Sequence, residues 1–178
     1  MRIIGGTFKG RRFHPPKFFK ARPTTDFAKE SLFNLINNVI DLEDKKVLDL
    51  FTGTGSISYE FMSRGCKEIH CVDISNKYLG FVKKTTGELN PDKKILFTIK
   101  ADVLKFLPKY ELDFDLIFAD PPYDLPGIEK IPELIFENQT LKNEAIVIIE
   151  HSASTDFSKH PNFKYQRKYG KVNFSFFK

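Results

Sequence analysis

The sequence has no tryptophan, only two methionines and two cysteines, and no long apolar run. No run approaches the roughly 18 apolar residues that a membrane-spanning helix needs, so we expect no such helix. Residues 1–6 lack the charged and apolar regions of a secretory signal. Cys66 and Cys71 form neither a CxxC nor a metal-ligand spacing, so we expect reduced structural thiols and no bound metal. These absences favour a cytoplasmic protein.

The length of 178 residues is that of one domain. Such a chain buries roughly 70% of the surface that it exposes when unfolded, so it needs no covalent staples. The 19 phenylalanines are expected to lie chiefly in the core. We predict a single, monomeric domain over residues 1–178, with a basic hairpin and link at 1–22 and a catalytic body at 23–178.

The charge is unevenly distributed along the chain. Residues 1–22 hold seven Lys and Arg, residues 159–178 hold six, and neither end contains an acid. The two ends therefore sum to +13, and the remaining residues to −8. Basic ends with interleaved aromatic residues indicate that a polyanion docks at the termini while the acidic body binds something else. The alternative is a pair of solvated edge strands that carry lysine against aggregation.

Hydrophobic periodicity predicts an α/β fold. A helix is expected at 26–40, with Thr25 or Asp26 as its cap. Several predicted strands are continuous apolar runs, which is typical of strands buried on both faces of a parallel sheet. The predicted sheet is mostly parallel and twisted, with helices on both faces and short antiparallel hairpins at the two ends of the chain. Its expected strands are 46–51, 69–74, 96–100, 114–119 and 145–150; the hairpins are 2–13, around Gly5-Gly6, and 163–177.

The segment Asp120-Pro121-Pro122-Tyr123 directly follows an apolar strand, Leu116 to Ala119. Open α/β sheets bind their ligands at the carboxyl ends of such strands. The prolines remove backbone donors and restrict the turn, which leaves Asp120 and the Pro121 carbonyl as acceptors beside an aromatic ring. This set suits a planar base that carries an amine. The plainer interpretation is a strand exit stiffened by proline.

A second motif, Asp49 to Gly55, joins the first strand to a helix through two glycines. Asp73 ends the next strand, at the spacing where a carboxylate accepts hydrogen bonds from ribose hydroxyls. A dinucleotide is the natural rival ligand, but Ser58 occupies the third glycine position and Asp49 would repel a pyrophosphate. S-adenosylmethionine, a cation without phosphate, fits these charges better. Asp102 would then reach the adenine. Taken alone, however, an aspartate placed like Asp49 or Asp102 is more often a turn or cap residue.

These motifs resemble those of Rossmann-type amino methyltransferases. The head of the chain, with Arg2 to Gly6, Lys9 to Arg12, Arg22 to Asp26 and Glu30 to Asn34, is similar to the RsmD family, bacterial methyltransferases of guanine N2 in 16S ribosomal RNA. The resemblance covers nearly the whole chain, but few residues that resemble the family's motifs lie beyond Glu150-His151.

The resemblance implies a Rossmann-like fold, S-adenosylmethionine as cofactor, no metal, and 16S ribosomal RNA or the small ribosomal subunit as partner. It implies catalytic roles for Asp120, Pro121, Pro122 and Tyr123. The predicted cofactor-binding residues are Thr25, Asp49, Phe51, Gly53, Gly55, Asp73, Ile74, Asp102 and Val103. The residues predicted to bind RNA are Arg2, Lys9, Arg11, Arg12 and Arg22.

Other functions remain open from the sequence. An adenine-N6 methyltransferase of DNA or RNA shares the Asp120 motif, and a nucleic-acid-binding module could keep the fold without catalysis. A dinucleotide oxidoreductase is a third alternative. The run Glu150-His151-Ser152 contains the residue types of a hydrolase triad, but consecutive residues of a strand alternate faces and cannot form that relay.

Overall fold

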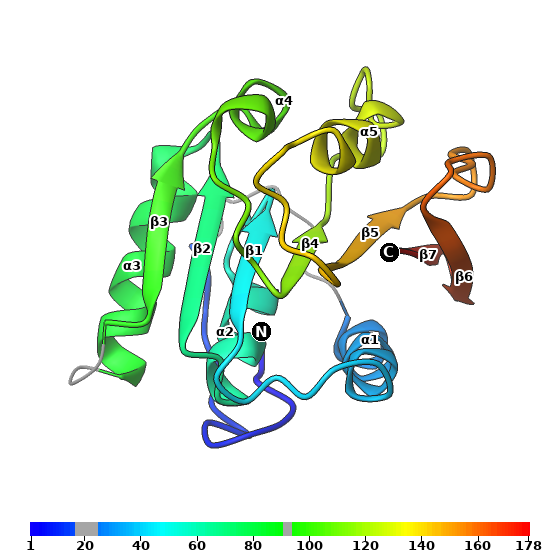
Figure 1. Cartoon of the computed structure of the whole chain (residues 1–178). Coiled ribbons are helices and arrows are strands. Elements are labelled where there is room, and N and C mark those ends of the chain that lie inside the picture. Colours follow the sequence, from blue (N-terminus) through cyan, green and yellow to red (C-terminus); the bar gives the residue numbers. More distant parts are fainter. Residues whose placement is uncertain (17–24, 91–93) are drawn as a thin grey trace.

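The computed structural model describes residues 1–16, 25–90 and 94–178. Helices and strands alternate along most of this chain (Figure 1). Its elements are α1 (Asp26–Asn37), β1 (Lys46–Leu50), α2 (Ser56–Ser63), β2 (Glu68–Asp73), α3 (Asn76–Leu89), β3 (Leu96–Lys100), α4 (Val103–Phe106), the 3-10 helix η1 (Leu107–Lys109), β4 (Leu116–Ala119), α5 (Lys130–Phe136), β5 (Ile146–His151), β6 (Phe163–Tyr169) and β7 (Val172–Phe177).

The strands of the described residues form one seven-stranded sheet in the order β3-β2-β1-β4-β5-β7-β6 (Figure 1). Strands β1 to β5 run parallel to one another, whereas β7 is antiparallel to both β5 and β6. The carboxyl ends of β1 to β5 therefore lie along one edge of the sheet. The predicted mostly parallel sheet and its antiparallel carboxyl-terminal hairpin are confirmed.

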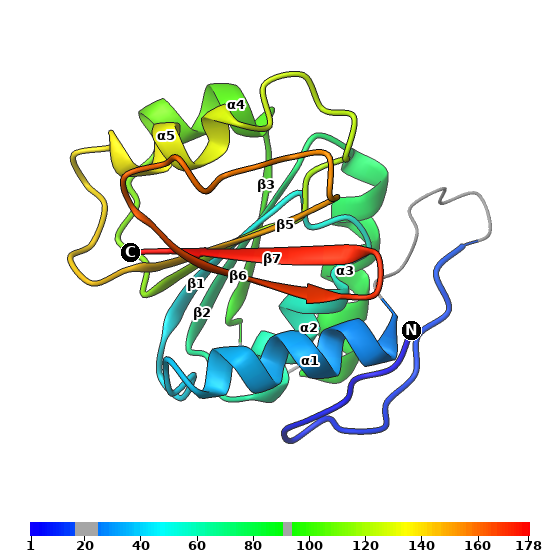
Figure 2. The same cartoon turned by 90° about the vertical axis from the view of Figure 1, so that its right-hand side faces the viewer.

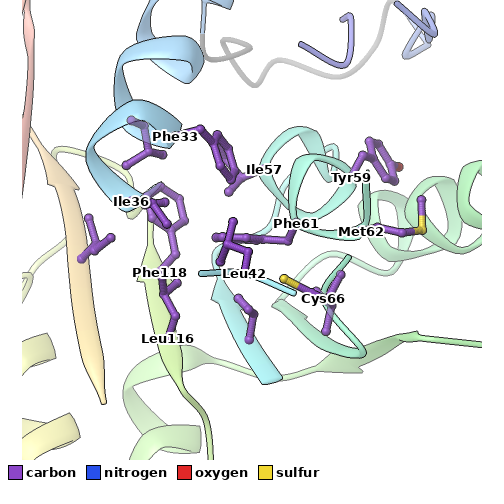
Figure 3. Packing of buried hydrophobic residues seen from close by; sticks show 14 of the residues in the cluster. Phe33, Ile36, Leu42, Ile57, Tyr59, Phe61, Met62, Cys66, Leu116 and Phe118 are labelled. Atoms are coloured by element: carbon purple, nitrogen blue, oxygen red, sulfur yellow. The ribbon is translucent and has the colours of Figure 1, made fainter. Parts of the chain in front are cut away.

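Helices cover both faces of the sheet, as predicted. Helices α4 and α5 lie on one face, and α1 and α2 lie on the other (Figure 2). On the second face, Phe33 of α1 and Phe61 of α2 meet edge to face, with ring centroids 5.2 Å apart. Both rings belong to the cluster that packs on Leu116 and Phe118 of β4 (Figure 3). Burial of each such side chain stabilises the fold by roughly 1.5–3 kcal/mol.

Helix α1 is shorter than the predicted 26–40. It begins where expected, because the Thr25 hydroxyl accepts a hydrogen bond from the Ala28 N–H at 3.2 Å. It ends at Asn37, and Asn38 is its carboxyl-terminal cap. Two consecutive asparagines disfavour helix because their side chains compete for backbone hydrogen bonds. Val39 lies beyond this end and is 43% exposed.

Several strand boundaries differ by one or two residues from the prediction. β1 ends at Leu50 because Phe51 has a φ of +60°, which an extended strand cannot contain. Ile74 follows β2 and is 68% exposed. β4 begins at Leu116, not at Phe114, since the Phe114 N–H donates to the nearby Leu112 carbonyl at 2.9 Å and closes a tight turn. β5 is shifted by one residue, to Ile146–His151.

The amino-terminal hairpin forms, but its turn is not where the sequence places it. An antiparallel bridge joins Arg2 to Arg12, and the turn spans residues 5–10 instead of Gly5-Gly6 alone. Gly6 is instead a point of close approach to α2. A Cβ atom there would lie 1.8 Å from the Ser63 carbonyl oxygen, so no other residue fits without displacing the backbone.

Two side chains of α2 hold this hairpin. Glu60 accepts the N–H of Ile4 at 2.7 Å and that of Gly5 at 3.3 Å, and the Ser63 hydroxyl accepts the Phe8 N–H at 2.9 Å. The buried Lys29 of α1 completes the contact, because its Nζ lies 3.4 Å from Glu60 Oε1 and donates to the Arg2 carbonyl. Helices α1 and α2 thereby fix the amino-terminal hairpin on the body.

Candidate active site

The polar segments that the sequence singled out meet at the carboxyl edge of the parallel sheet. The glycine loop 51–55 follows β1, Asp73 ends β2, Asp102 follows β3, and Asp120 follows β4. The sheet order reverses direction between β1 and β4. Ligands bind at such a switch point, because the connections on either side diverge and leave a crevice. The glycine loop follows β1 and Asp120 follows β4, so the two segments flank this switch point.

The two glycines of the loop have different structural roles. Gly55 has a φ of +80°, and a Cβ atom there would lie 2.8 Å from Cζ of Tyr59. Gly53 has a φ of +54°, but the nearest atom to its added Cβ is the Phe51 carbonyl oxygen at 3.8 Å. Gly55 therefore allows the loop to pack on α2, whereas Gly53 leaves space where a ligand can approach the backbone. Phe51 is itself strained, because left-handed backbone is rare for a bulky residue.

Asp73 joins the glycine loop to β2. Its Oδ2 accepts the Gly53 N–H and its Oδ1 accepts the Ser75 N–H, each at 2.8 Å. A carboxylate oxygen has more than one acceptor position, so Asp73 can still bind two hydroxyls. Ile74 beside it is 68% exposed, an apolar surface on which a flat ring can pack.

Asp49 is turned away from solvent. Its carboxyl is buried, accepts a hydrogen bond from the Ser58 hydroxyl, and has its pKa raised to about 7, chiefly by loss of water. The Asp49 carbonyl also accepts the Thr52 hydroxyl at 2.8 Å. Asp49 therefore joins β1 to α2. A direct contact of its carboxyl with a cofactor stays a prediction.

Asp102 is a helix cap, the alternative that the sequence left open. Its Oδ1 accepts the Leu104 N–H at 3.1 Å, and its Oδ2 lies 3.8 Å from Nζ of Lys105. Val103 is buried in the cluster beneath α4 and α5. A contact of Asp102 or Val103 with a cofactor stays a prediction.

The turn after β4 carries Asp120 and Tyr123. The Asp120 N–H donates to the Leu50 carbonyl at 3.2 Å, and the Leu125 N–H donates to the Pro122 carbonyl at 2.9 Å. Pro121 is buried, whereas Pro122 and Tyr123 are exposed. Both ends of the turn are thus held by the backbone while the tyrosine ring reaches solvent.

The structure adds Glu150 to this site, a residue that the sequence offered only as part of an implausible hydrolase triad. Tyr123 donates its hydroxyl to Glu150 Oε1 at 3.1 Å. Desolvation raises the pKa of Asp120 well above its ordinary value, and the charges of Glu150 and then Asp49 raise it further. Glu150 directly follows the apolar run 145–149, as Asp120 follows the run 116–119, and that signal could have found it. His151 instead donates to or accepts from the Ser175 hydroxyl at 2.8 Å, so no triad forms.

This arrangement favours ligands that bring positive charge or N–H groups. Asp49, Asp120 and Glu150 all have raised pKa values, chiefly because burial removes water from their carboxyl groups. A cation or a hydrogen-bond donor would stabilise their ionised forms. A pyrophosphate would add negative charge to the same edge, so a dinucleotide fits poorly.

The remaining predicted binding residues lie around the hairpin and α1. Lys9, Arg11 and Arg12 are exposed. Arg2 is exposed as well, and its Nε lies 3.1 Å from Asp26 Oδ2. Thr25 caps α1, and a cofactor contact for it stays a prediction. Arg22 lies outside the described residues.

Within residues 1–16, 25–90 and 94–178, no group of three or more His, Cys, Asp or Glu side chains is arranged to hold a metal ion. In that part of the chain no helix has the length and apolarity to span a bilayer. Cys66 and Cys71 are buried and free, as expected for structural thiols.

The family model described as Conserved hypothetical protein 95 matches residues 1–178. The Ribosomal RNA small subunit methyltransferase D of Buchnera aphidicola subsp. Baizongia pistaciae is 30% identical over 99% of this chain and 91% of its own length. The Haemophilus influenzae protein of the same name is 32% identical over 84% of this chain and 78% of its own length.

Solved structures share the fold. An Escherichia coli protein that is provisionally described as a methyltransferase superposes with a TM-score of 0.85 at 23% identity, over 99% of this chain and 96% of its own. The ribosomal protein L11 methylase of Lactobacillus delbrueckii gives a TM-score of 0.68 at 16% identity, over 87% of this chain and 80% of its own.

The fold is that of a Rossmann-like methyltransferase, as the sequence predicted. More narrowly, the chain belongs to the RsmD family, whose model covers it from end to end.

Proposed function

We propose that this protein transfers a methyl group from S-adenosylmethionine to the exocyclic N2 amine of a guanine in 16S ribosomal RNA. The observation that carries the proposal is the Asp120 turn, set across the sheet's switch point from the open glycine loop. The RNA substrate is supported by relatives named Ribosomal RNA small subunit methyltransferase D. The target amine is supported by the head motifs and by the chemistry of the turn.

The residues at the switch point fit S-adenosylmethionine. Asp73 would accept the ribose hydroxyls, Gly53 would allow close approach, and Ile74 would pack on the adenine. The acidic edge would offset the positive charge of the sulfonium and the ammonium. When bound, the cofactor supplies a methyl group activated by the sulfonium. Thr25, Asp49, Phe51, Gly55, Asp102 and Val103 would complete or support this site.

Asp120 and Tyr123 would orient the target amine. The lone pair of a guanine N2 amine is delocalised into the ring, so attack requires a fixed nitrogen with both protons engaged. Asp120 and the Pro121 carbonyl would accept those protons, while Tyr123 stacks on the base and Pro122 stiffens the turn. Positioning and electrostatic support of this kind need no further nucleophile.

The substrate must present an unpaired or flipped base, because a paired amine cannot enter the site. Flipping costs a few kcal/mol. Phosphate contacts by Arg2, Lys9, Arg11, Arg12 and Arg22 would offset that cost. In this proposal residues 1–22 serve as the RNA-binding head of a single domain, and residues 23–178 bind the cofactor and carry out catalysis.

An adenine-N6 methyltransferase of DNA or RNA is the second candidate. It is favoured by the same observation, since the Asp120 turn recognises any planar amine. The two candidates differ in the nucleotide that receives the methyl group.

Transfer of labelled methyl tests both. The protein is incubated with labelled S-adenosylmethionine and either naked 16S RNA, assembled small subunits or DNA, and the labelled nucleoside is identified. We expect N2-methylguanosine from ribosomal RNA or subunits. Replacement of Asp120 by alanine should lower kcat about 100-fold, because an oriented acceptor is lost, while cofactor affinity changes little.

The matched control is Asp113→Ala, which removes an exposed aspartate whose carboxylate pairs with Lys46 at the other end of the strands. It should leave methyl transfer intact. Label in N6-methyladenosine, or label in DNA alone, would replace the guanine proposal with the adenine one. Full activity of the Asp120→Ala variant would refute the role of Asp120.

A further inference from the structure

Glu150 lies beside Asp120 at the carboxyl edge of the sheet. β4 and β5 are parallel, and their pairing ends with Ala119 opposite Ile149, so Asp120 and Glu150 come next in the same register. Residues at paired positions of parallel strands point to the same face. The two carboxyl groups are therefore neighbours by construction of the sheet.

Glu150 is buried with half of its carboxyl group unpaired. The residue is 4% exposed, and its Oε1 accepts the Tyr123 hydroxyl. Its Oε2 is buried and has no hydrogen-bond partner among the described residues. A buried carboxylate that keeps its charge without a partner is strongly disfavoured, and a proton on the free oxygen removes that charge.

Among the described residues, no cation contributes to the pKa of Glu150. The titratable groups of this part of the chain that face it are Asp120 and Tyr123, and Asp49 of β1 lies beyond Asp120. On its other side β7 places Phe174 opposite Glu150. Desolvation accordingly raises the pKa of Glu150 to about 7, so its carboxyl holds its proton to higher pH than an ordinary glutamate.

We propose that Glu150 is a positioning residue that works in its neutral, protonated form: it holds the Tyr123 hydroxyl through Oε1 and leaves Asp120 as the ionised member of the carboxyl pair. Two neighbouring carboxyl groups share one proton more readily than they carry two charges. The charge of Glu150 is one cause of the raised pKa of Asp120, so a proton on Glu150 removes that cause and makes Asp120 easier to ionise. This inference deepens the proposed function and rests on it, because it names what prepares Asp120 and Tyr123 for the target amine.

The proton balance of the site follows from this assignment. Before reaction the pair holds one proton, on Glu150. As the amine loses a proton, its N–H bond breaks with the electron pair left on nitrogen, and a new O–H bond forms on Asp120. The pair then holds two protons and returns one to solvent after the product leaves. Glu150 does not touch the substrate, since its free oxygen is buried.

The first test measures protonation in the free protein, without cofactor or RNA. Side-chain ¹³C-carboxyl NMR of glutamate-labelled protein is followed from pH 4 to 9, and the Glu150 signal is assigned by its loss in Glu150→Gln. The proposal expects Glu150 to titrate near or above neutrality. Titration close to the ordinary glutamate value would overturn it.

The second test compares kcat and KM of Glu150→Gln, Glu150→Ala and Tyr123→Phe. Glutamine mimics the neutral acid, because it keeps an acceptor for Tyr123 and a donor in place of the free O–H. We expect Glu150→Ala to lower kcat about tenfold with little change in KM for the cofactor, and Glu150→Gln to restore most of that loss. Exposed Glu137→Gln is the matched control.

Double mutants decide whether Glu150 acts through Tyr123. Tyr123→Phe should cost less in the Glu150→Ala background than in the wild type, because the shared hydrogen bond is already absent. Equal damage by Glu150→Gln and Glu150→Ala, or full additivity with Tyr123→Phe, would overturn the proposal. If the wild-type protein methylates no RNA, the proposed function fails, yet the NMR titration still decides the protonation of Glu150. Because this titration uses the wild-type protein, it tests the protonation of Glu150 even if the Glu150→Ala variant fails to fold.

Discussion

Of the two glycines in the loop after β1, we expect Gly55 to serve the packing of the fold and Gly53 to serve ligand binding. Gly53 and Gly55 both have positive φ, but only Gly55 is crowded by α2. We therefore predict that Gly55→Ala lowers the free energy of unfolding by about 1–3 kcal/mol, through left-handed strain and contact with Tyr59. Gly53→Ala should cost about 1 kcal/mol from strain alone and should weaken S-adenosylmethionine binding more than it weakens stability. Urea unfolding and calorimetric titration measure the two effects.

The pair serves as its own control, since both variants add one methyl group to one loop. Equal losses of stability would show that the space at Gly53 is not open. Unchanged cofactor affinity in Gly53→Ala would remove this glycine from the binding site.

At the scale of elements, the amino-terminal hairpin depends on one buried carboxylate of α2. Glu60 accepts two backbone N–H groups of the hairpin and pairs with Lys29 and Arg64. Glu60→Ala removes the carboxylate nearest to the buried Lys29, so we predict a loss of about 3–5 kcal/mol in the free energy of unfolding. Glu88→Ala breaks the exposed pair with Lys84 on α3 and should cost less than about 0.5 kcal/mol.

Urea denaturation of the two variants checks this prediction. Proteolysis near residues 1–16 gives a second measurement, since a released hairpin becomes susceptible before the body unfolds. A Glu60→Ala protein as stable and as resistant as Glu88→Ala would show that the hairpin is held by other contacts.

At the scale of the whole molecule, basic ends flank an acidic body. If Arg11 and Arg12 contact phosphates, their joint replacement by alanine should reduce the slope of log K against log salt for RNA binding by about 1.4–1.8. The double variant Lys83→Ala/Lys84→Ala removes the same charge from exposed positions on α3 and should leave the slope near its wild-type value. Filter binding over a range of salt gives both slopes, and an unchanged slope in the arginine variant would exclude these phosphate contacts.

The sequence by itself determined the architecture and the edge where chemistry is placed. Continuous apolar runs such as Leu116 to Ala119 indicate strands that are buried on both faces, and the repeated alternation of such strands with helices favours a covered parallel sheet. A parallel sheet then gathers its carboxyl ends, so residues that follow separate strands, such as Asp73 and Asp120, must share one edge. The head and the strand-end motifs also indicated the family, which the comparisons confirm.

Tertiary structure decided which polar residues serve the fold and which remain for ligands. Asp49 bonds Ser58 and Asp102 caps a helix, whereas Gly53 stays open, and no local pattern separates these outcomes. The Tyr123–Glu150 hydrogen bond joins residues 27 positions apart through the pairing of β4 with β5. Periodicity reports which face of an element is buried; it does not report which two buried polar groups meet, because that depends on strand order and register.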